Sequence, residues 1–238
     1  LKQRVLVAVI LLPIGLVLIF LGGWAFTLTI ALILGLAARE FAQLFRQGGY
    51  QPAGFLVIAA AAAMALGRGW KGFEADAIII GLLILAGMTY HLMAYENGRD
   101  QAATDFAITV AGGMYLGFIG AYLVSLRNLP EGLWWVLLAL PAVWLADSGA
   151  YFIGRAFGKH KMSKRLSPKK SWEGYIGGIL TSMIGTALLA LLWQTLASVW
   201  PATLESAAQI SPLNGAILGL AVGILAPLGD LGESMIKR

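Results

Sequence analysis

The stretch LWWVLLALPAVWLADSGAYFI, Leu133–Ile153, decides the fold class of this chain. Asp147 is the only charged residue in it, and a helix of about 20 residues is long enough to cross a hydrocarbon core of about 30 Å. Similar continuous apolar runs recur along the sequence, which predicts a helical protein that crosses the membrane several times. The runs do not alternate apolar and polar residues, so a transmembrane β-barrel is excluded.

The overall composition agrees with a membrane protein. The chain has 238 residues, of which 59% are hydrophobic and 12% charged, whereas about 25% of the residues in a typical soluble domain are charged. Cysteine is absent, which excludes disulfides, thiolate metal sites and a cysteine nucleophile. The two histidines are too few for a histidine-based zinc site.

The apolar runs and their interruptions predict an all-α, polytopic integral-membrane bundle with about eight transmembrane helices in one domain, residues 1–238. The expected spans are Val5–Leu21, Trp24–Phe45, Pro52–Leu66, Ala77–Tyr95, Ala103–Leu126, Leu133–Ile153, Tyr175–Trp193 and Pro212–Met235. The expected connections contain Gly22-Gly23, Gly48-Gly49, Gly67, Pro130 and Pro201. The first run resembles a signal peptide but is followed by no small-x-small cleavage site, so we expect a retained helix. No internal repeat supports an inverted-repeat transporter.

The basic residues predict the orientation of this bundle. With the N-terminus inside, only Arg68, Lys71 and Arg127 of the 17 basic residues fall at outer helix ends. The excess of Lys and Arg in cytoplasmic segments then predicts that both ends of this chain are cytoplasmic.

Asp147 has two readings. A charge within a membrane span costs about 2.5–3.5 kcal/mol on insertion scales, so it normally faces a partner or a polar cavity. It is either a buried carboxylate satisfied by hydroxyls such as that of Ser148, or a functional carboxylate. The polar and small neighbours Gly149, Tyr151 and Gly154 favour the functional reading.

A second group of polar residues lies in LAPLGDLGESMIKR, at the end of the chain. Asp230, Glu233, Ser234 and Lys237 are spaced to share one helical face. Two carboxylates one turn apart suit Mg²⁺, which takes one or two carboxylates together with substrate phosphates and water. The alternative is a solvated helix end with a Glu233–Lys237 ion pair. Pro227 just upstream could break or kink the helix.

Other polar residues are expected to be structural. His91 follows a Thr-Tyr pair in an apolar run and is interpreted as an interfacial or packed histidine. Glu96, Arg99 and Asp100 are expected in a solvated loop.

The segment GKHKMSKRLSPKKSWEG, Gly158–Gly174, is strongly basic and lies between two apolar runs. It could be a cytoplasmic loop that contacts anionic lipid. However, Ser167-Pro168 breaks the chain, Lys169-Lys170 follow at once, and Ser171 can cap the next helix. Lysines, a hydroxyl and free N–H groups at a helix start favour a phosphate site. The segment contains no Walker A or G-x-G-x-x-G motif. It is short and tied to the membrane at both ends, which disfavours nucleic-acid binding.

Three blocks now carry a family resemblance: DSGAYFIGR at 147–155, SPKKSWEG at 167–174 and GDLGESMIKR at 229–238. In this order and spacing they closely resemble the phosphatidate cytidylyltransferases, also called CDP-diacylglycerol synthases. The resemblance implies that CTP and phosphatidic acid give CDP-diacylglycerol and pyrophosphate with Mg²⁺, with a second cation left open. It also implies a multi-pass protein of the cell inner (plasma) membrane, an active site on the cytoplasmic side, contact with membrane lipids and a homodimer.

The resemblance also implies roles for individual residues. The catalytic residues would be Asp230, Asp147 and Lys170, and the metal ligands Asp230, Asp147 and Glu233. The substrate-binding residues would be Ser167, Lys169, Lys170, Ser171, Trp172, Glu173, Arg155, Ser234, Lys237 and Arg238. The family pattern continues beyond the final Lys-Arg with a His-Gly-Gly turn and a D-R-x-D group. A further carboxylate and a further C-terminal helix are therefore expected beyond Arg238.

Two other functions stay open. One is a related CTP-dependent lipid enzyme, either a CDP-archaeol synthase or a polyprenol kinase. A kinase would release CDP, whereas a cytidylyltransferase would release pyrophosphate. The other is a lipid or ion transporter with cation-binding carboxylates, which would need no CTP.

Overall fold

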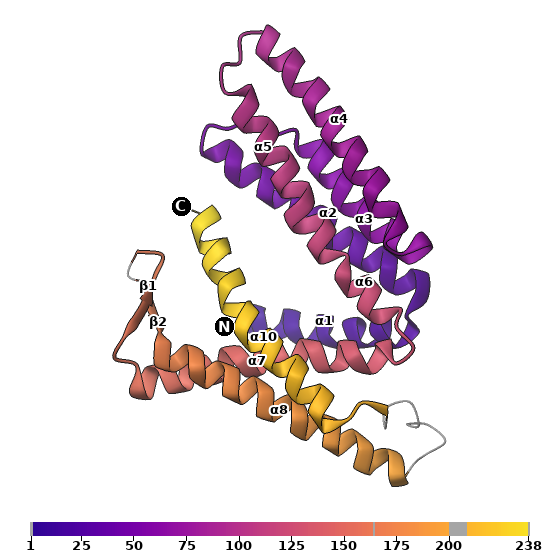
Figure 1. The fold of residues 1–238 in the computed structure, drawn as a ribbon, viewed down its shortest axis with the longest axis vertical. Coiled ribbons are helices and arrows are strands. Elements are labelled where there is room, and N and C mark those ends of the chain that lie inside the picture. The colour runs from indigo at the N-terminus through magenta and orange to yellow at the C-terminus, as the bar shows by residue number, and fades with distance from the viewer. Residues whose placement is uncertain (1, 164, 200–208, 238) are drawn as a thin grey trace. The chain divides into compact units, whose positions relative to one another are not determined.

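The structure, a computed structural model, describes residues 2–163, 165–199 and 209–237, with side chains from residue 11 onward. The chain divides into two units, an N-terminal unit of Leu1–Pro130 and a C-terminal unit of Glu131–Arg238 (Figure 1). Both are built almost entirely from helices, as the apolar runs predict.

The N-terminal unit is arranged around a central helix. Its elements are α1 (Lys2–Leu21), α2 (Gly23–Gln47), α3 (Gly54–Lys71), α4 (Glu74–Glu96), α5 (Ala102–Gly112), the π-helical turn η1 (Gly113–Phe118) and α6 (Tyr122–Arg127). Helix α3 contacts α2, α4, α5, η1 and α6, and its side chains Val57, Ala61 and Met64 are fully buried. A helix enclosed by other helices is apolar on most of its surface, which explains the alanine-rich sequence of α3.

The end of α3 differs from the sequence prediction. The predicted connection at Gly67 is wrong, because α3 continues to Lys71 and the turn comes at Gly72, whose φ is +61°. Gly67 is instead a packing position: a Cβ there would lie 2.7 Å from the Cβ of Ala75. One residue later, the buried Arg68 donates from Nε to Asp76 Oδ2 at 2.8 Å.

A second buried polar group joins the connections of the N-terminal unit. Asp105 is fully buried and accepts hydrogen bonds from the backbone N–H of Gln51 and from Arg99 Nε, both at 2.8 Å. Arg99 lies in the turn between α4 and α5, as predicted, and its side chain is 24% exposed while it pairs with Asp105. His91 is a packed histidine, 3% exposed, with Nε2 3.0 Å from Thr109 Oγ1, which confirms one of the two readings for it.

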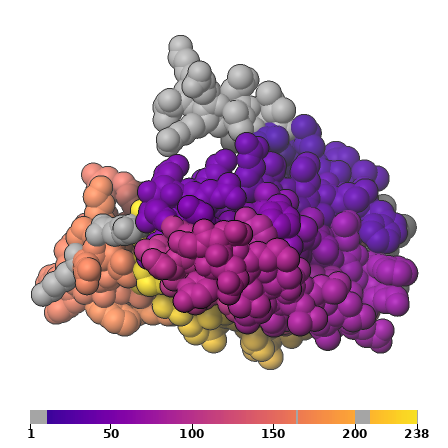
Figure 2. Space-filling view, turned by 90° about the horizontal axis from the view of Figure 1, so that it is seen from above, coloured from indigo at the N-terminus to yellow at the C-terminus, as the bar shows by residue number. Residues whose placement is uncertain are grey.

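The C-terminal unit is a three-helix group with a hairpin. Its elements are α7 (Gly132–Phe157), β1 (Lys161–Ser163), β2 (Ser167–Ser171), α8 (Trp172–Val199) and α10 (Pro212–Ile236), and each of the three helices contacts the other two. The strands are antiparallel, with Lys161 opposite Ser171 and Ser163 opposite Ser167. The sequence does not predict this hairpin, whose strands are short and polar. Its atoms lie together with the adjoining ends of α7 and α8 in Figure 2.

Small residues bring α8 and α10 into close contact. Gly215, Gly219 and Gly223 are spaced four residues apart on α10 and face Thr186, Ser182 and Ile179 of α8. Thr186 Oγ1 donates across the interface to the carbonyl of Gly215 at 2.7 Å. Close backbone approach and interhelical hydrogen bonds are how helices associate in lipid, where the hydrophobic effect between helices is weak.

Six helical segments in the described ranges are long and apolar enough to cross a membrane: α2, α4, α5 to α6, α7, α8 and α10. The other two expected spans are also helical, as α1 and α3. All eight predicted spans therefore coincide with helical segments, and the protein is a polytopic helical membrane protein.

Candidate functional site

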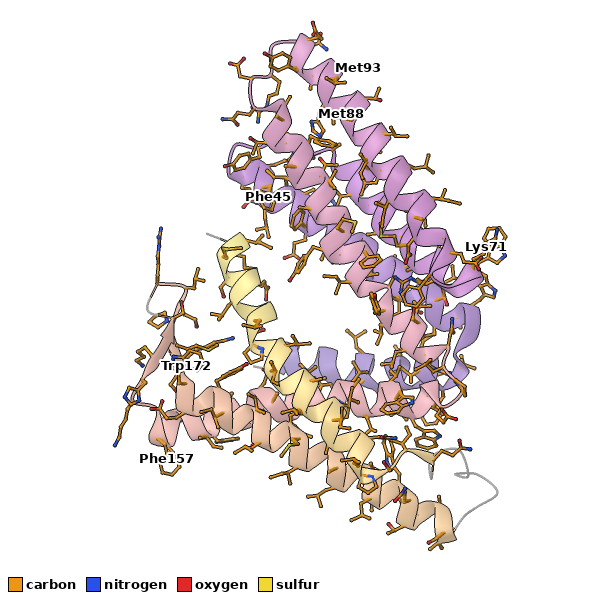
Figure 3. The ribbon with its side chains drawn as sticks, in the orientation of Figure 1. Phe45, Lys71, Met88, Met93, Phe157 and Trp172 are labelled. Atoms are coloured by element: carbon orange, nitrogen blue, oxygen red, sulfur yellow. The ribbon has the colours of Figure 1, made fainter. Side chains whose placement is uncertain are left out.

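A cavity of about 690 Å³ opens in the C-terminal unit where the hairpin meets the helices. Side chains from α7, the hairpin, the start of α8 and α10 surround it. Figure 3 shows Phe157 at the end of α7 and Trp172 at the start of α8, at the same end of this unit as the hairpin. Of the sequence-predicted site residues, the cavity is lined by Asp147, Arg155, Ser167, Lys169, Lys170, Ser171 and Asp230.

An ion pair between the hairpin and α10 crosses this cavity. Lys170 Nζ lies 2.8 Å from Asp230 Oδ2, and the same ammonium group is 3.5 Å from the carbonyl of Pro227. Pro227 does not break α10, which is continuous from Pro212 to Ile236. A proline removes one backbone donor from a helix and so leaves a carbonyl one turn earlier free. The carbonyl that faces Lys170 is a different one, that of Pro227 itself.

Ser171 and neighbouring glycines position the hairpin. Ser171 Oγ accepts a hydrogen bond from the backbone N–H of Gly174 at 3.2 Å, which confirms the predicted N-cap of α8. Gly154 of α7 and Gly174 of α8 lie against each other, since a Cβ on Gly174 would be 3.0 Å from the Cα of Gly154. The end of α7 and the start of α8 therefore meet closely at the base of the hairpin that joins them.

The cavity carries more positive than negative side chains. Its charged lining residues are the cations Arg155, Lys161, Lys169 and Lys170 and the carboxylates Asp147 and Asp230. Arg155 donates to the hydroxyl of Tyr151 at 3.1 Å, one turn earlier on α7. Cations around two carboxylates suit a ligand with several phosphates and a bound cation.

Comparison with known proteins gives the family. The model of the cytidylyltransferase family matches residues 2–238. This chain belongs to the cytidylyltransferase family. Similar proteins, each called phosphatidate cytidylyltransferase, come from Synechocystis sp. (30% identity; 99% of this chain and 84% of the relative), Bacillus subtilis (29%; 100% and 84%) and Brucella suis (31%; 100% and 80%).

The cavity of this cytidylyltransferase-family protein fits a divalent cation only together with a ligand. Within residues 2–163, 165–199 and 209–237, no three His, Asp or Glu side chains are grouped to hold a metal ion. Asp147 and Asp230 supply two carboxylates to one cavity. Mg²⁺ is commonly bound by one or two carboxylates together with substrate phosphates and water. The donor set therefore fits Mg²⁺ that arrives with phosphates.

Several predicted residues lie outside the cavity. Glu233 is exposed and forms an ion pair with Lys237, as the alternative reading of this helix end expects, and Ser234 does not line the cavity. Trp172 and Glu173 line a different hollow. The roles of these residues stay predictions, and Arg238 lies outside the described residues.

Of the cavity residues outside the predicted set, those with the largest side chains are Tyr151, Lys161, Met162 and Tyr175. Tyr151 and Tyr175 lie four residues after Asp147 and Ser171, so helical spacing could have indicated them. Lys161 and Met162 reach the cavity because β1 pairs with β2. No sequence pattern in this short polar segment indicates that pairing.

Proposed function

We propose that this protein transfers the cytidylyl group of CTP to phosphatidic acid, giving CDP-diacylglycerol and pyrophosphate. The observation that carries the proposal is the meeting of the three sequence blocks in one cavity, where Lys170 of the hairpin pairs with Asp230 of α10 beside Asp147 of α7. The names of the relatives, each called phosphatidate cytidylyltransferase, support the same reaction.

The reaction needs no protein nucleophile. An oxygen of the phosphatidate phosphate forms a bond to the α-phosphorus of CTP, and the bond from that phosphorus to the oxygen bridging to the β-phosphate breaks. Pyrophosphate leaves with the electron pair of that bond. The protein must hold the two phosphate groups in line and stabilise negative charge as it moves to the leaving group.

The cavity cations are suited to these tasks. Lys169 and Lys170 follow one another on β2, next to the Ser171 cap, and line the cavity together with Ser167. We assign them to the triphosphate. Arg155, at the end of α7, would hold a phosphate of either substrate. When CTP arrives, its phosphates replace Asp230 as the partner of Lys170, and the Asp230 carboxylate becomes free for another cation.

Mg²⁺ is the cofactor that we propose, with Asp147 and Asp230 as its protein ligands. Bound there, it would neutralise phosphate charge and stabilise the leaving pyrophosphate. Glu233 would join only if its ion pair with Lys237 opened.

We also propose the setting in which the reaction takes place. The distribution of basic residues supports a protein of the cell inner membrane, with the N-terminus and the cavity on the cytoplasmic side, where CTP is available. A homodimer and a single catalytic domain are part of the same proposal. Mass measurement of the detergent-solubilised protein by light scattering tests the dimer.

The proposal is tested with CTP labelled at the α-phosphate, phosphatidic acid and Mg²⁺, using the purified full-length protein. Label should enter the lipid fraction, pyrophosphate should be released, and removal of divalent cations by EDTA should stop the transfer until Mg²⁺ is added. Asp230→Asn should lower the rate about 100-fold or more. The exposed Asp100 serves as control, and Asp100→Asn should stay within about twofold.

Other outcomes of this assay point elsewhere. Release of CDP with label absent from the lipid would indicate a kinase. If a thermal unfolding measurement shows that the protein is folded and it still does not react with CTP, the protein is not an enzyme of this class.

A further inference from the structure

A second hollow, also of about 690 Å³, lies beside the hairpin and is lined by Lys159, His160, Lys161, Trp172, Glu173 and Ile176. It shares Lys161 with the cavity described above but has none of that cavity's carboxylates. The function proposed so far leaves this hollow without a role.

The hollow continues into an exposed apolar stripe on α8. Trp172, Ile176, Leu180, Ile184 and Leu188 follow at intervals of four residues, and 47 to 59% of each is exposed. Residues four apart are neighbours on the surface of a helix, so the stripe is continuous, and it winds gradually round α8. In a membrane-spanning helix, such an exposed apolar face meets acyl chains, and a tryptophan at its end lies at headgroup level.

Two lysines stand at the polar end of this stripe. Within the part of the chain that the structure describes, Lys159 and Lys161 form no ion pair with a carboxylate. The one carboxylate in the hollow is already engaged: Glu173 Oε1 lies 2.6 Å from His160 Nδ1, and both carboxylate oxygens accept from the His160 backbone N–H at 3.2 Å. The lysines are therefore available to an external anion.

We propose that this hollow binds an anionic phospholipid, with its phosphate between Lys159 and Lys161 and its acyl chains along the stripe from Ile176 to Leu188. The two parts of the surface match the two parts of such a lipid. A water-soluble anion would use the lysines alone, whereas the exposed tryptophan and the stripe below it favour a ligand with chains.

The shared lysine gives this site a role in the reaction. Lys161 borders both the hollow and the cavity, so a lipid phosphate bound in the hollow already contacts a cation of the cavity. The hollow is then the side from which the lipid substrate reaches the cavity. This role rests on the proposed function, whereas the lipid binding does not.

The absence of cysteine from the chain allows a direct binding test. Ile176→Cys is labelled with a bimane fluorophore in lipid nanodiscs. Its quenching is then measured with phosphatidic acid or phosphatidylcholine whose acyl chains carry a nitroxide close to the glycerol. We expect phosphatidic acid to quench at an effective concentration on the order of tenfold lower than phosphatidylcholine, because each lysine near a membrane surface favours anionic lipid. Bimane at the equally exposed Ile217 of α10 should show little preference.

Charge removal tests the assignment to the two lysines. Lys159→Gln and, separately, Lys161→Gln should each reduce the preference at Ile176 several-fold. Lys71→Gln, which removes a lysine beside another exposed tryptophan, should not change it. Equal quenching by the two lipids at Ile176, or a preference that survives both substitutions, would overturn the proposal. If bimane at residue 176 shows the preference for phosphatidic acid but the protein has no transferase activity, the lipid site is supported and the proposed function is rejected.

Discussion

At the scale of single residues, the pair of Lys170 and Asp230 is more informative about chemistry than about stability. The lysine side chain is 29% exposed and the aspartate side chain 53%. Exposed ion pairs contribute about 0–1 kcal/mol to folding. A pair that stabilises so little, but holds a cation and a carboxylate against a cavity, is suited to exchange partners when a charged substrate enters.

Lys170→Ala separates these two roles. We expect transfer from CTP to fall about 100- to 1000-fold, as when one group that stabilises transition-state charge is removed, while the free energy of unfolding changes by less than about 1 kcal/mol. The measurements are initial rates and thermal unfolding in the same detergent, with Lys71→Ala as control. A fall in activity that only follows a large fall in thermal stability would show a structural role instead.

Residue types at helix ends could be read from the sequence, but contacts across the cavity could not. Ser171 was identifiable as a cap because a serine followed by an apolar run has one favourable local structure. The spacing of Asp230, Glu233 and Lys237 allowed either a metal site at the two carboxylates or a Glu233–Lys237 ion pair, and the structure shows the ion pair. Lys161 resembled any other lysine in a basic segment, since its place at the cavity depends on strand pairing.

At the scale of elements, the hairpin is held from its ends rather than by its own sequence. Its strands comprise Lys161–Ser163 and Ser167–Ser171, and an isolated two-stranded hairpin is at best marginally stable in water. The Ser171 cap fixes one end. Glu173 fixes the other by binding the backbone and ring of His160. The hairpin could not be predicted because the groups that hold its ends, Gly174 and Glu173, lie beyond the strands, at the start of α8.

Glu173→Gln should therefore loosen the hairpin. An amide has one acceptor oxygen instead of two and no charge, so its hydrogen bonds to His160 are weaker. We expect faster tryptic cleavage after Lys159, Lys161 and Lys169, measured by limited proteolysis with mass spectrometry. Glu233→Gln, which opens an exposed ion pair on α10, is the matched control. We expect tryptic cleavage to be faster in Glu173→Gln and unchanged in Glu233→Gln. Equal cleavage rates in the two variants would contradict the role of Glu173 in holding the hairpin.

The second element-scale feature is the contact between α8 and α10, the helix that carries Asp230. A Cβ on Gly219 would collide with Thr186 Oγ1 and lie 2.8 Å from the carbonyl carbon of Ser182. The side chain of Gly219→Val therefore cannot fit unless α8 and α10 move apart. Gly232, on the same helix, has no atom within 4 Å of its Cβ position.

Gly219→Val should lower the free energy of unfolding by about 1–3 kcal/mol, as for overpacking in a close-packed core. Gly232→Ala should raise it by up to about 1 kcal/mol, because alanine loses less conformational entropy in a helix than glycine. Thermal unfolding of the two variants and the parent in one detergent makes the comparison. If both variants shifted in the same direction by the same amount, close packing at Gly219 would not be the cause.

At the scale of the whole molecule, the length and hydropathy of the apolar runs predict the helices, because the bilayer imposes both. The burial of polar residues inside the N-terminal unit cannot be predicted in this way. Arg68 and Asp76 lie near helix ends, where charges normally face water, yet both are buried. The guanidinium carbon of Arg68 also lies 3.7 Å from the ring centroid of Phe73. Desolvated charges are tolerated when they are paired and hydrogen-bonded, and sequence spacing does not show which charges will be.

The orientation of all the helices follows from one rule and can be tested as a whole. If the excess of basic residues is cytoplasmic, the turn after α4 and the hairpin face the cytoplasm, while the ends of α3 and α6 face the other side. The chain has no cysteine, so single cysteines report their own accessibility. In intact spheroplasts, a membrane-impermeant maleimide should label Lys71→Cys and Asn128→Cys, but should label Asp100→Cys and Ser163→Cys only after permeabilisation. Labelling of Ser163→Cys in intact cells would place the cavity on the side without CTP, and the proposed reaction could not take place there.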